Sequence, residues 1–335
     1  MATKLDISQL DFDGIKDNLK TFLSQQDEFT DYDFEGAGMN VLLDTLAYNT
    51  HYLAYNANML ANEMYLDSAD QRTSVVSLAK QVGYTPRSAN SAKATIDVVV
   101  NNATGSSLTM SRGTKFTTTV DGTNYSFVNN ADVSITPQDG VFKFSNLDIF
   151  EGTYLNYKYT ANTTDTDQRF IIPNDNVDTT TLSVKIQESV SDSTTNTYTL
   201  AGGVTGIDST SKVYFLQEVE DGRFEVYFGD GVLGQGVADG NIVILDYITC
   251  NRAEANGASA FTLSGSIGNF SNVTITTLNN AANGDDPESI KSIKYNAPRD
   301  YSAQDRAVTA EDYKVLVKSL YSNAQSVQVY GGEDA

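Results

Sequence analysis

Residues 39–66 carry two separate lines of apolar side chains at helical spacing, and this pattern limits the possible folds more than any other. The leucine seam consists of Met39, Leu42, Leu46, Leu53, Leu60 and Met64. The tyrosine seam consists of Val41, Tyr48, Tyr52, Tyr55 and Met59. A continuous helix over this segment would be roughly 40 Å long. Because one helix with two apolar faces needs two neighbours, the segment predicts a bundle.

Two shorter helical patterns, at residues 12–23 and 69–82, flank this segment. The apolar face of the first consists of Phe12, Ile15, Leu19, Phe22 and Leu23. Gly83 and Pro86 end the second. The three helices either close a bundle within the chain or pair with helices of other chains, because periodicity shows that a face is buried but not by what.

The composition changes near Lys93, and from there to about Ala282 short alternating runs of Thr, Ser, Asn, Gly and Val predict a β-rich region. Candidate strands are 95–100, 125–128, 182–186, 213–216 and 242–245. Asp-Gly pairs at 121–122, 221–222 and 230–231 supply the positive φ angles of tight turns.

The segment from Gly284 onward changes again. Pro287 can open a helix, residues 309–312 resemble a capping box, and a strand-like run, 326–330, follows. One helix and one strand do not close a sheet, so the last domain is expected to be incomplete: either the chain is a fragment or a partner completes it.

These patterns predict an α+β, multidomain chain with three parts. They are a helical assembly region at 1–85, a β-rich domain at 86–282 and the start of an α/β domain at 283–335.

Charge and cysteine content exclude several classes of function. The chain has 43 acidic and 22 basic side chains and a net charge of −21, which disfavours direct binding to nucleic acid or anionic lipid. No apolar stretch follows Met1, so we expect no signal peptide, no membrane span and a cytosolic place of synthesis. Cys250 is the single cysteine, which rules out an internal disulfide and a multi-cysteine zinc site.

Candidate catalytic groups are few. Residues 229–234 match G-x-G-x-x-G, but a strand rather than a helix is expected after them, at 242–247, which favours a β-turn over a dinucleotide site. The single histidine, His51, lies within the helical segment, where a packing role is the more common one. Acid pairs at 165/167 and 285/286 are expected by chance in so acidic a chain. We therefore predict no enzymatic activity, no cofactor and no metal site.

Four stretches of the chain resemble, in the same order, the motifs of one protein family. The first covers 31–36, 40–42 and 46–50, and the second covers 112–116 with 125–128. The third covers 224–232 with 239–240 and 256–258, and the fourth covers 297–299, 306–309, 311–313 and 331–334. Their key positions are Asp33, Phe34, Gly36, Asn40, Gly113, Gly229, Asp230, Gly231, Arg306, Thr309, Asp312 and Tyr313. The first stretch looks like the helical motif of the inner baseplate wedge proteins of contractile-tailed (myovirus) phages. The second and third are similar to the wider baseplate J-like family.

The resemblance implies a structural subunit of the virion tail baseplate, assembled in the host bacterial cytoplasm. Two copies per wedge would form a homodimer whose helices bundle with each other and with a smaller wedge protein, and six wedges would surround the hub. Hub and sheath-proximal proteins are further candidate partners. The interface would then include Ile15, Leu19, Phe22, Leu42, Leu46, Leu53, Leu60 and Met64, which could instead form a private core.

Such a subunit would relay conformational change during sheath contraction by moving as a rigid body about hinges. The linkers 86–92 and 279–286 are the hinge candidates. A first alternative is a β-rich receptor-binding or adhesin-like tail protein that uses residues 93–282. A second is a polysaccharide hydrolase with a carboxylate pair in a cleft.

Overall fold

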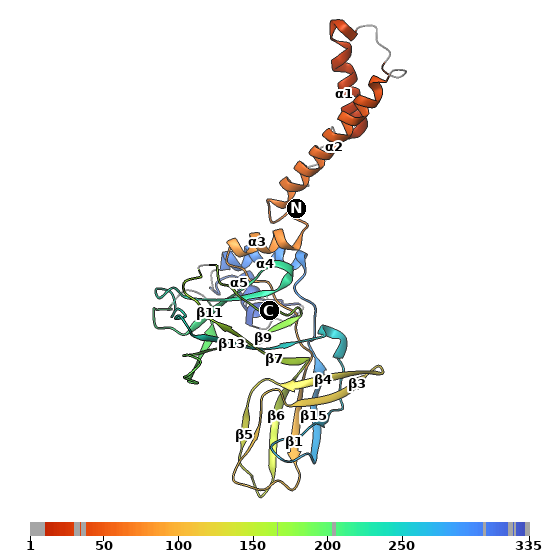
Figure 1. Ribbon diagram of the computed structural model, residues 1–335. Helices are drawn as coiled ribbons and strands as arrows, with labels where there is room; N and C mark the ends of the chain where they lie inside the picture. The colour runs from red at the N-terminus through yellow and green to blue at the C-terminus, as the bar shows by residue number, and fades with distance from the viewer. Residues whose placement is uncertain are drawn as a thin grey trace. The chain divides into compact units, whose positions relative to one another are not determined.

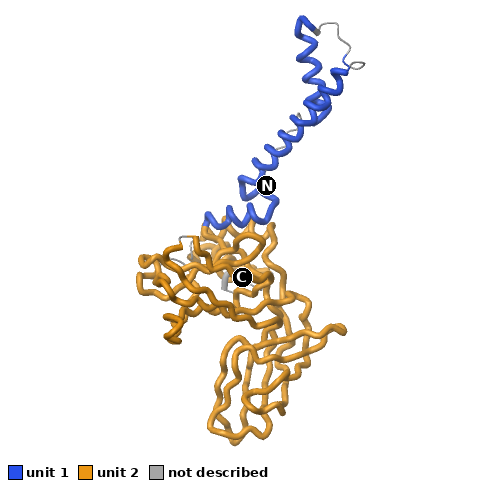
Figure 2. Tube along the Cα trace, viewed as in Figure 1, with its two compact units in different colours: residues 1–82 blue, residues 83–335 orange. Residues whose placement is uncertain are grey.

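The computed structural model describes residues 11–29, 34, 38–165, 167–202, 206–303, 306–320, 324 and 326–331. It divides into two compact units, residues 1–82 and 83–335 (Figure 2).

The first unit is helical and contains α1 (Phe12–Ser24), the 3-10 turn η2 (Asp27–Phe29), α2 (Met39–Glu63) and α3 (Arg72–Gln81) (Figure 1). The Asp11 side chain caps α1 by accepting a hydrogen bond from the Gly14 amide at 2.7 Å. The long segment forms the single continuous helix that its periodicity predicts. Helix α1 packs beside the first part of α2.

The second unit begins with a six-stranded antiparallel sheet in the order β14-β3-β4-β6-β1-β15. Its strands are β1 (Lys93–Val100), β3 (Lys115–Val120), β4 (Thr123–Asn129), β6 (Phe142–Glu151), β14 (Thr262–Ser264) and β15 (Val273–Ala282). A small sheet pairs β2 (Leu108–Met110) with β5 (Val133–Ile135). Alternate residues of β1 are buried, so its period of two places Ile96 and Val98 in one core with Phe116 and Phe127.

A seven-stranded sheet in the order β7-β13-β9-β10-β11-β12-β8 encloses a second core. Its strands are β7 (Thr153–Thr160), β8 (Phe170–Ile171), β9 (Val177–Gln187), β10 (Thr195–Leu200), β11 (Val213–Glu218), β12 (Phe224–Phe228) and β13 (Ile242–Thr249). Short 3-10 turns, η3 (Glu220–Gly222) and η4 (Arg252–Ala255), follow β11 and β13. The strands predicted within 93–282 all lie within observed strands, but the 86–282 region contains two cores.

Two helices, α4 (Ile290–Ala303) and α5 (Ala310–Leu320), follow the sheets. Helix α5 has the predicted capping box, because the Asp312 amide donates to Thr309 Oγ1 at 3.2 Å and the Thr309 amide donates to Asp312 Oδ2 at 2.8 Å. Residues 326–330 are not a strand. That prediction was wrong because a strand needs a paired neighbour, which local alternation does not supply. The α+β, multidomain class is confirmed.

In the part of the chain that the structure describes, no helix combines the length and hydropathy needed to cross a membrane.

Candidate assembly interface

Helix α1 covers only one side of α2. The buried residues of α2 are Leu43 and Ala47, and an ion pair of 2.5 Å between Lys16 Nζ and Asp44 Oδ1 lies beside them. Successive helical residues are rotated by about 100°. The leucine seam, the tyrosine seam and the side covered by α1 therefore lie roughly a third of a turn apart.

Both apolar seams of α2 are exposed among the described residues. Leu42, Leu46, Leu53, Leu60 and Met64 are 54–67% exposed, and Val41, Tyr48, Tyr52, Tyr55 and Met59 are 39–67% exposed. No residue of α2 after Ala47 is buried. A continuous apolar surface of this kind is typical of a site of association with another chain.

The predicted interface residues of α1 fall into two groups. Ile15 is buried and Leu19 is partly buried, so both lie in the region that already packs within the hairpin. Phe22 is 61% exposed. The described hairpin thus has a small core of its own and leaves the larger apolar surface, on α2, open.

The helical family motif is only partly described. Phe34 is buried, and Asn40 lies in the first turn of α2. Asp33 and Gly36 lie outside the described residues.

Gly113 has a packing role in the motif at 112–116. Its φ angle is +80°, and a Cβ there would lie 2.9 Å from Cδ1 of Tyr154. Both the backbone conformation and the close approach of a tyrosine ring therefore favour glycine.

Arg112, beside Gly113, joins the two sheets. Its Nη1 is 3.2 Å from Asp246 Oδ2, and the two side chains are only 12% and 4% exposed. Its Nη2 donates to the Thr181 carbonyl oxygen at 3.0 Å, and its guanidinium lies 5.1 Å from the centre of the Tyr154 ring. Arg112 precedes β3 and Asp246 lies on β13, so the motif links one core to the other.

Asp246 is held as a buried carboxylate. Burial alone would raise its pKa, but hydrogen bonds from Asn156 and Tyr154, at 2.6 and 2.7 Å, and the charges of Arg112 and Lys185 lower the pKa below its ordinary value. No local pattern pairs Arg112 with a residue so distant in the sequence, so sequence reasoning missed this contact.

The glycine-rich segment 229–234 is a tight loop, as predicted. Asp230 Oδ1 accepts hydrogen bonds from the amides of Val232 and Leu233 at 2.9 and 3.1 Å. A Cβ on Gly229 would lie 2.1 Å from the Leu233 carbonyl oxygen, and Gly231 has a φ of +86°. The next element is β13, so the loop does not open a helix.

The last motif lies around α5. Thr309 and Asp312 form its capping box, and Tyr313 is 48% exposed. Arg306 precedes the helix, and its amide donates to the Ala303 carbonyl oxygen at 2.9 Å.

Other candidate chemical groups take part in ion pairs or are buried. Asp285 and Asp286 form ion pairs with Arg87 and Arg252. Burial raises the pKa of the Cys250 thiol to about 11. Among the described residues, no group of three or more His, Cys, Asp or Glu side chains could hold a metal ion.

One polar cavity of about 320 Å³ includes Glu151 and Asp175 in its lining. Burial raises the pKa of Glu151. Both of its carboxylate oxygens accept hydrogen bonds from Asn251, at 2.7 and 2.8 Å. This carboxylate connects the end of β6 to the residues after β13.

A long helix with two exposed apolar faces is typical of a subunit that assembles with other chains. Residues 11–84 match the family model described as baseplate wedge protein gp6-like, helical domain. Residues 157–257 match bacteriophage baseplate wedge protein gp6, third domain. Two separate parts of the chain thus match gp6-like baseplate wedge models, which confirms the resemblance to phage baseplate wedge proteins found in the sequence.

Two individual proteins give further comparisons. Baseplate wedge protein gp6 of Enterobacteria phage T4 is 30% identical over 349 aligned positions, which cover 95% of this chain and 51% of that protein. The chain thus spans about half the length of this relative. A chain in a cryo-EM structure of the anti-feeding prophage (AFP) baseplate is 10% identical, with a TM-score of 0.35, covering 91% of this chain and 63% of that one. A TM-score this low does not establish a common fold.

Proposed function

We propose that this chain is a structural subunit of a phage tail baseplate wedge, which acts by holding partner subunits and not by catalysis. It would be assembled in the host bacterial cytoplasm and reside in the virion. The observation that carries this proposal is the surface of α2, on which two apolar seams are exposed. The same residues match the helical-domain model of the baseplate wedge proteins.

The arrangement around α2 supports two further helical neighbours. Since α1 covers one side of the first part of α2, the leucine and tyrosine seams leave room for two more helices. Both seams contain residues seven positions apart, but only Leu46, Leu53 and Leu60 place leucine at each repeat, which is typical of a core position of two-stranded coiled coils. We assign the leucine seam to a second copy of the chain and the tyrosine seam to another wedge protein.

Two finer parts of the proposal concern the wider protein family and the mechanical role. The baseplate J-like relation is supported by the motifs at 112–116 and 224–232. Contacts with hub and sheath-proximal proteins, and a relay of movement during sheath contraction, follow from a position in the wedge. The second unit would take part in that relay through its joined sheets, because Arg112 connects their cores.

The test is co-expression with the neighbouring wedge protein of the same phage, followed by native mass measurement of the purified complex. We expect two copies of this chain with one partner. A stable monomer that binds neither a second copy nor the partner would contradict the proposal. Release of sugars from cell-wall or capsule polymer, lost on Glu151→Gln, would instead favour a hydrolase.

A further inference from the structure

Of the two linkers expected to act as hinges, the first, 86–92, is largely buried, and the second, 279–286, is more exposed but held by hydrogen bonds and ion pairs. Residues 88–92 of the first linker, in the order Ser, Ala, Asn, Ser and Ala, are 0–4% exposed. The Ser91 amide donates to Asp178 Oδ2 at 2.9 Å within the buried interior. A hinge needs residues that are free to change their backbone angles, whereas this segment is buried and hydrogen-bonded.

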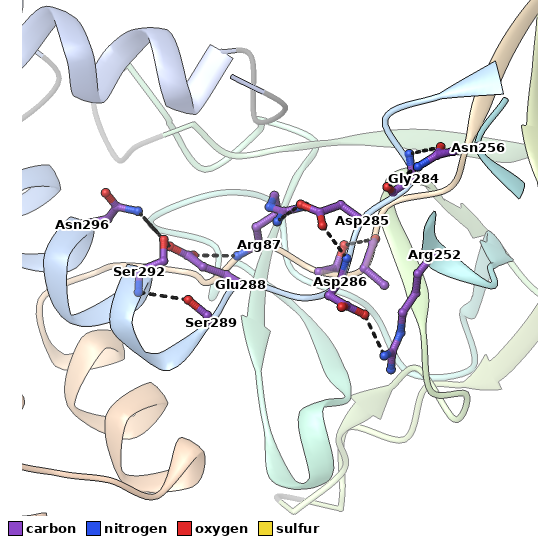
Figure 3. A network of polar contacts seen from close by, with 12 residues as sticks. Arg87, Arg252, Asn256, Gly284, Asp285, Asp286, Glu288, Ser289, Ser292 and Asn296 are labelled. Atoms are coloured by element: carbon purple, nitrogen blue, oxygen red, sulfur yellow. Dashed lines mark hydrogen bonds and ion pairs between the residues drawn. The ribbon is translucent and has the colours of Figure 1, made fainter. Parts of the chain in front are cut away.

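The first linker lies antiparallel to the segment that leaves the six-stranded sheet (Figure 3). The amides of Asn90 and Asp285 donate to each other's carbonyl oxygens at 3.0 and 3.1 Å, and the Glu288 amide donates to the Arg87 carbonyl oxygen at 2.9 Å. An ion pair of 2.7 Å joins Arg87 Nη2 to Asp285 Oδ2. The entry and exit segments of the β-rich region are therefore paired with each other.

Glu288 is the centre of this pairing. Glu288 is only 5% exposed. Its carboxylate oxygen Oε2 accepts hydrogen bonds from the Tyr84 hydroxyl at 2.8 Å and from the Arg87 amide at 3.2 Å. Oε1 accepts from Ser292 Oγ at 2.5 Å and Asn296 Nδ2 at 2.8 Å. One carboxylate thus connects the entry segment to the first two turns of α4.

Tyr84 is kept in the form that this contact requires. Burial, together with the negative charge of Glu288, raises the pKa of Tyr84 well above its ordinary value. Its hydroxyl therefore remains a hydrogen-bond donor to Glu288.

The exit segment is also anchored to the turn after β13. Asn256 exchanges two hydrogen bonds with the backbone of Gly284, at 2.9 and 3.0 Å, and Arg252 pairs with Asp286 at 2.8 Å. A Cβ on Gly284 would lie 2.1 Å from the Arg252 carbonyl oxygen. The backbones are too close for any other residue at this position.

We propose that residues 84–90 and 284–296 form a polar clasp that makes α4 move together with the β-rich region, with Glu288 as its central residue. The clasp replaces the two hinges that the linker sequences suggest. This inference concerns the second unit alone and does not depend on the proposed function.

The test is hydrogen–deuterium exchange on the full chain, comparing wild type with Glu288→Gln and Tyr84→Phe. Glutamine keeps the shape of the side chain but replaces one accepting oxygen with a donor. We expect exchange in residues 84–92 and 288–303 to rise at least about tenfold in Glu288→Gln and less in Tyr84→Phe, with β1 and β13 unchanged. The matched control is Glu311→Gln, because Glu311 is an exposed carboxylate on α5 whose 2.7 Å pair with Lys314 is local.

Two results would overturn the clasp. One is exchange in both segments that equals wild type in each variant. The other is a uniform rise through both sheets, which would make Glu288 part of the global core. If Glu288→Gln does not fold, Tyr84→Phe decides by the same criterion.

Discussion

At the scale of single residues, the second unit depends on charges buried between its two cores. The Arg112–Asp246 pair is the clearest example, since both side chains are largely removed from water. Such a pair adds little to the stability of the folded protein compared with two well-packed apolar side chains. Removing only one partner, however, leaves an uncompensated buried charge.

Arg112→Leu should therefore be strongly destabilising. We expect a loss of about 3 kcal/mol in the free energy of unfolding, because Asp246 keeps Lys185, at 3.4 Å, as a weaker partner. Urea unfolding followed by circular dichroism measures the loss. The control is Lys314→Ala, which removes an exposed pair with Glu311 and should cost less than about 1 kcal/mol. Equal losses in the two variants would argue against the buried pair.

The lowered pKa of Asp246 predicts a dependence on pH. A carboxyl group whose pKa is lowered on folding stabilises the protein above its unfolded-state pKa, and this contribution is lost as pH falls through the folded-state pKa. We expect the stability gap between wild type and Asp246→Asn to shrink as pH falls below the ordinary value of 3.8. Unfolding curves between pH 7 and the lowest pH at which both proteins fold provide the measurement. A gap that is constant with pH would contradict the assignment.

At the scale of elements, α2 carries many apolar side chains that the described part of the chain does not bury. Its second half has no buried residue, and a helix of this length gains most of its stability from packing. The two seams differ in chemistry, because one is mainly leucine and the other mainly tyrosine. This difference makes their partners separable by mutation.

Leu53→Asp should abolish self-association and Tyr52→Asp should weaken binding of the other wedge protein. Each places a charge in an apolar contact on a different side of the same helix. Native mass spectrometry of the co-expressed complex distinguishes the two losses. Leu200→Asp is the control, because Leu200 is 53% exposed on β10, similar to Leu53 at 62%. If both α2 variants lose the same partner, the assignment of the seams is wrong.

At the scale of the whole molecule, the chain divides into two compact units, residues 1–82 and 83–335. Each core of the second unit is built from residues of that unit. The second unit is therefore expected to fold without α1, α2 and α3 of the first unit.

A fragment of residues 83–335 should retain its β-sheet circular dichroism and unfold in one cooperative transition. The polar contacts between the two cores, including Arg112 with Asp246, are expected to make them unfold together. Thermal unfolding followed at two wavelengths tests this. Two separate transitions would show that the cores are independent.

The local features of this protein are those that its sequence determined. The two seams of α2, the strands within 93–282, the Asp-Gly turns and the capping box at Thr309 were all predictable, because each depends on residues only a few positions apart. The family motifs were equally visible, since they are short and ordered along the chain.

Only the tertiary structure decided how distant segments pair. It divided residues 86–282 between two cores, brought Arg112 to Asp246, and joined the linkers that were expected to be hinges. It also showed that α1 covers neither seam of α2. Contacts of this kind depend on which packed arrangement of the whole chain satisfies its buried charges and apolar faces, and periodicity carries no information about that choice.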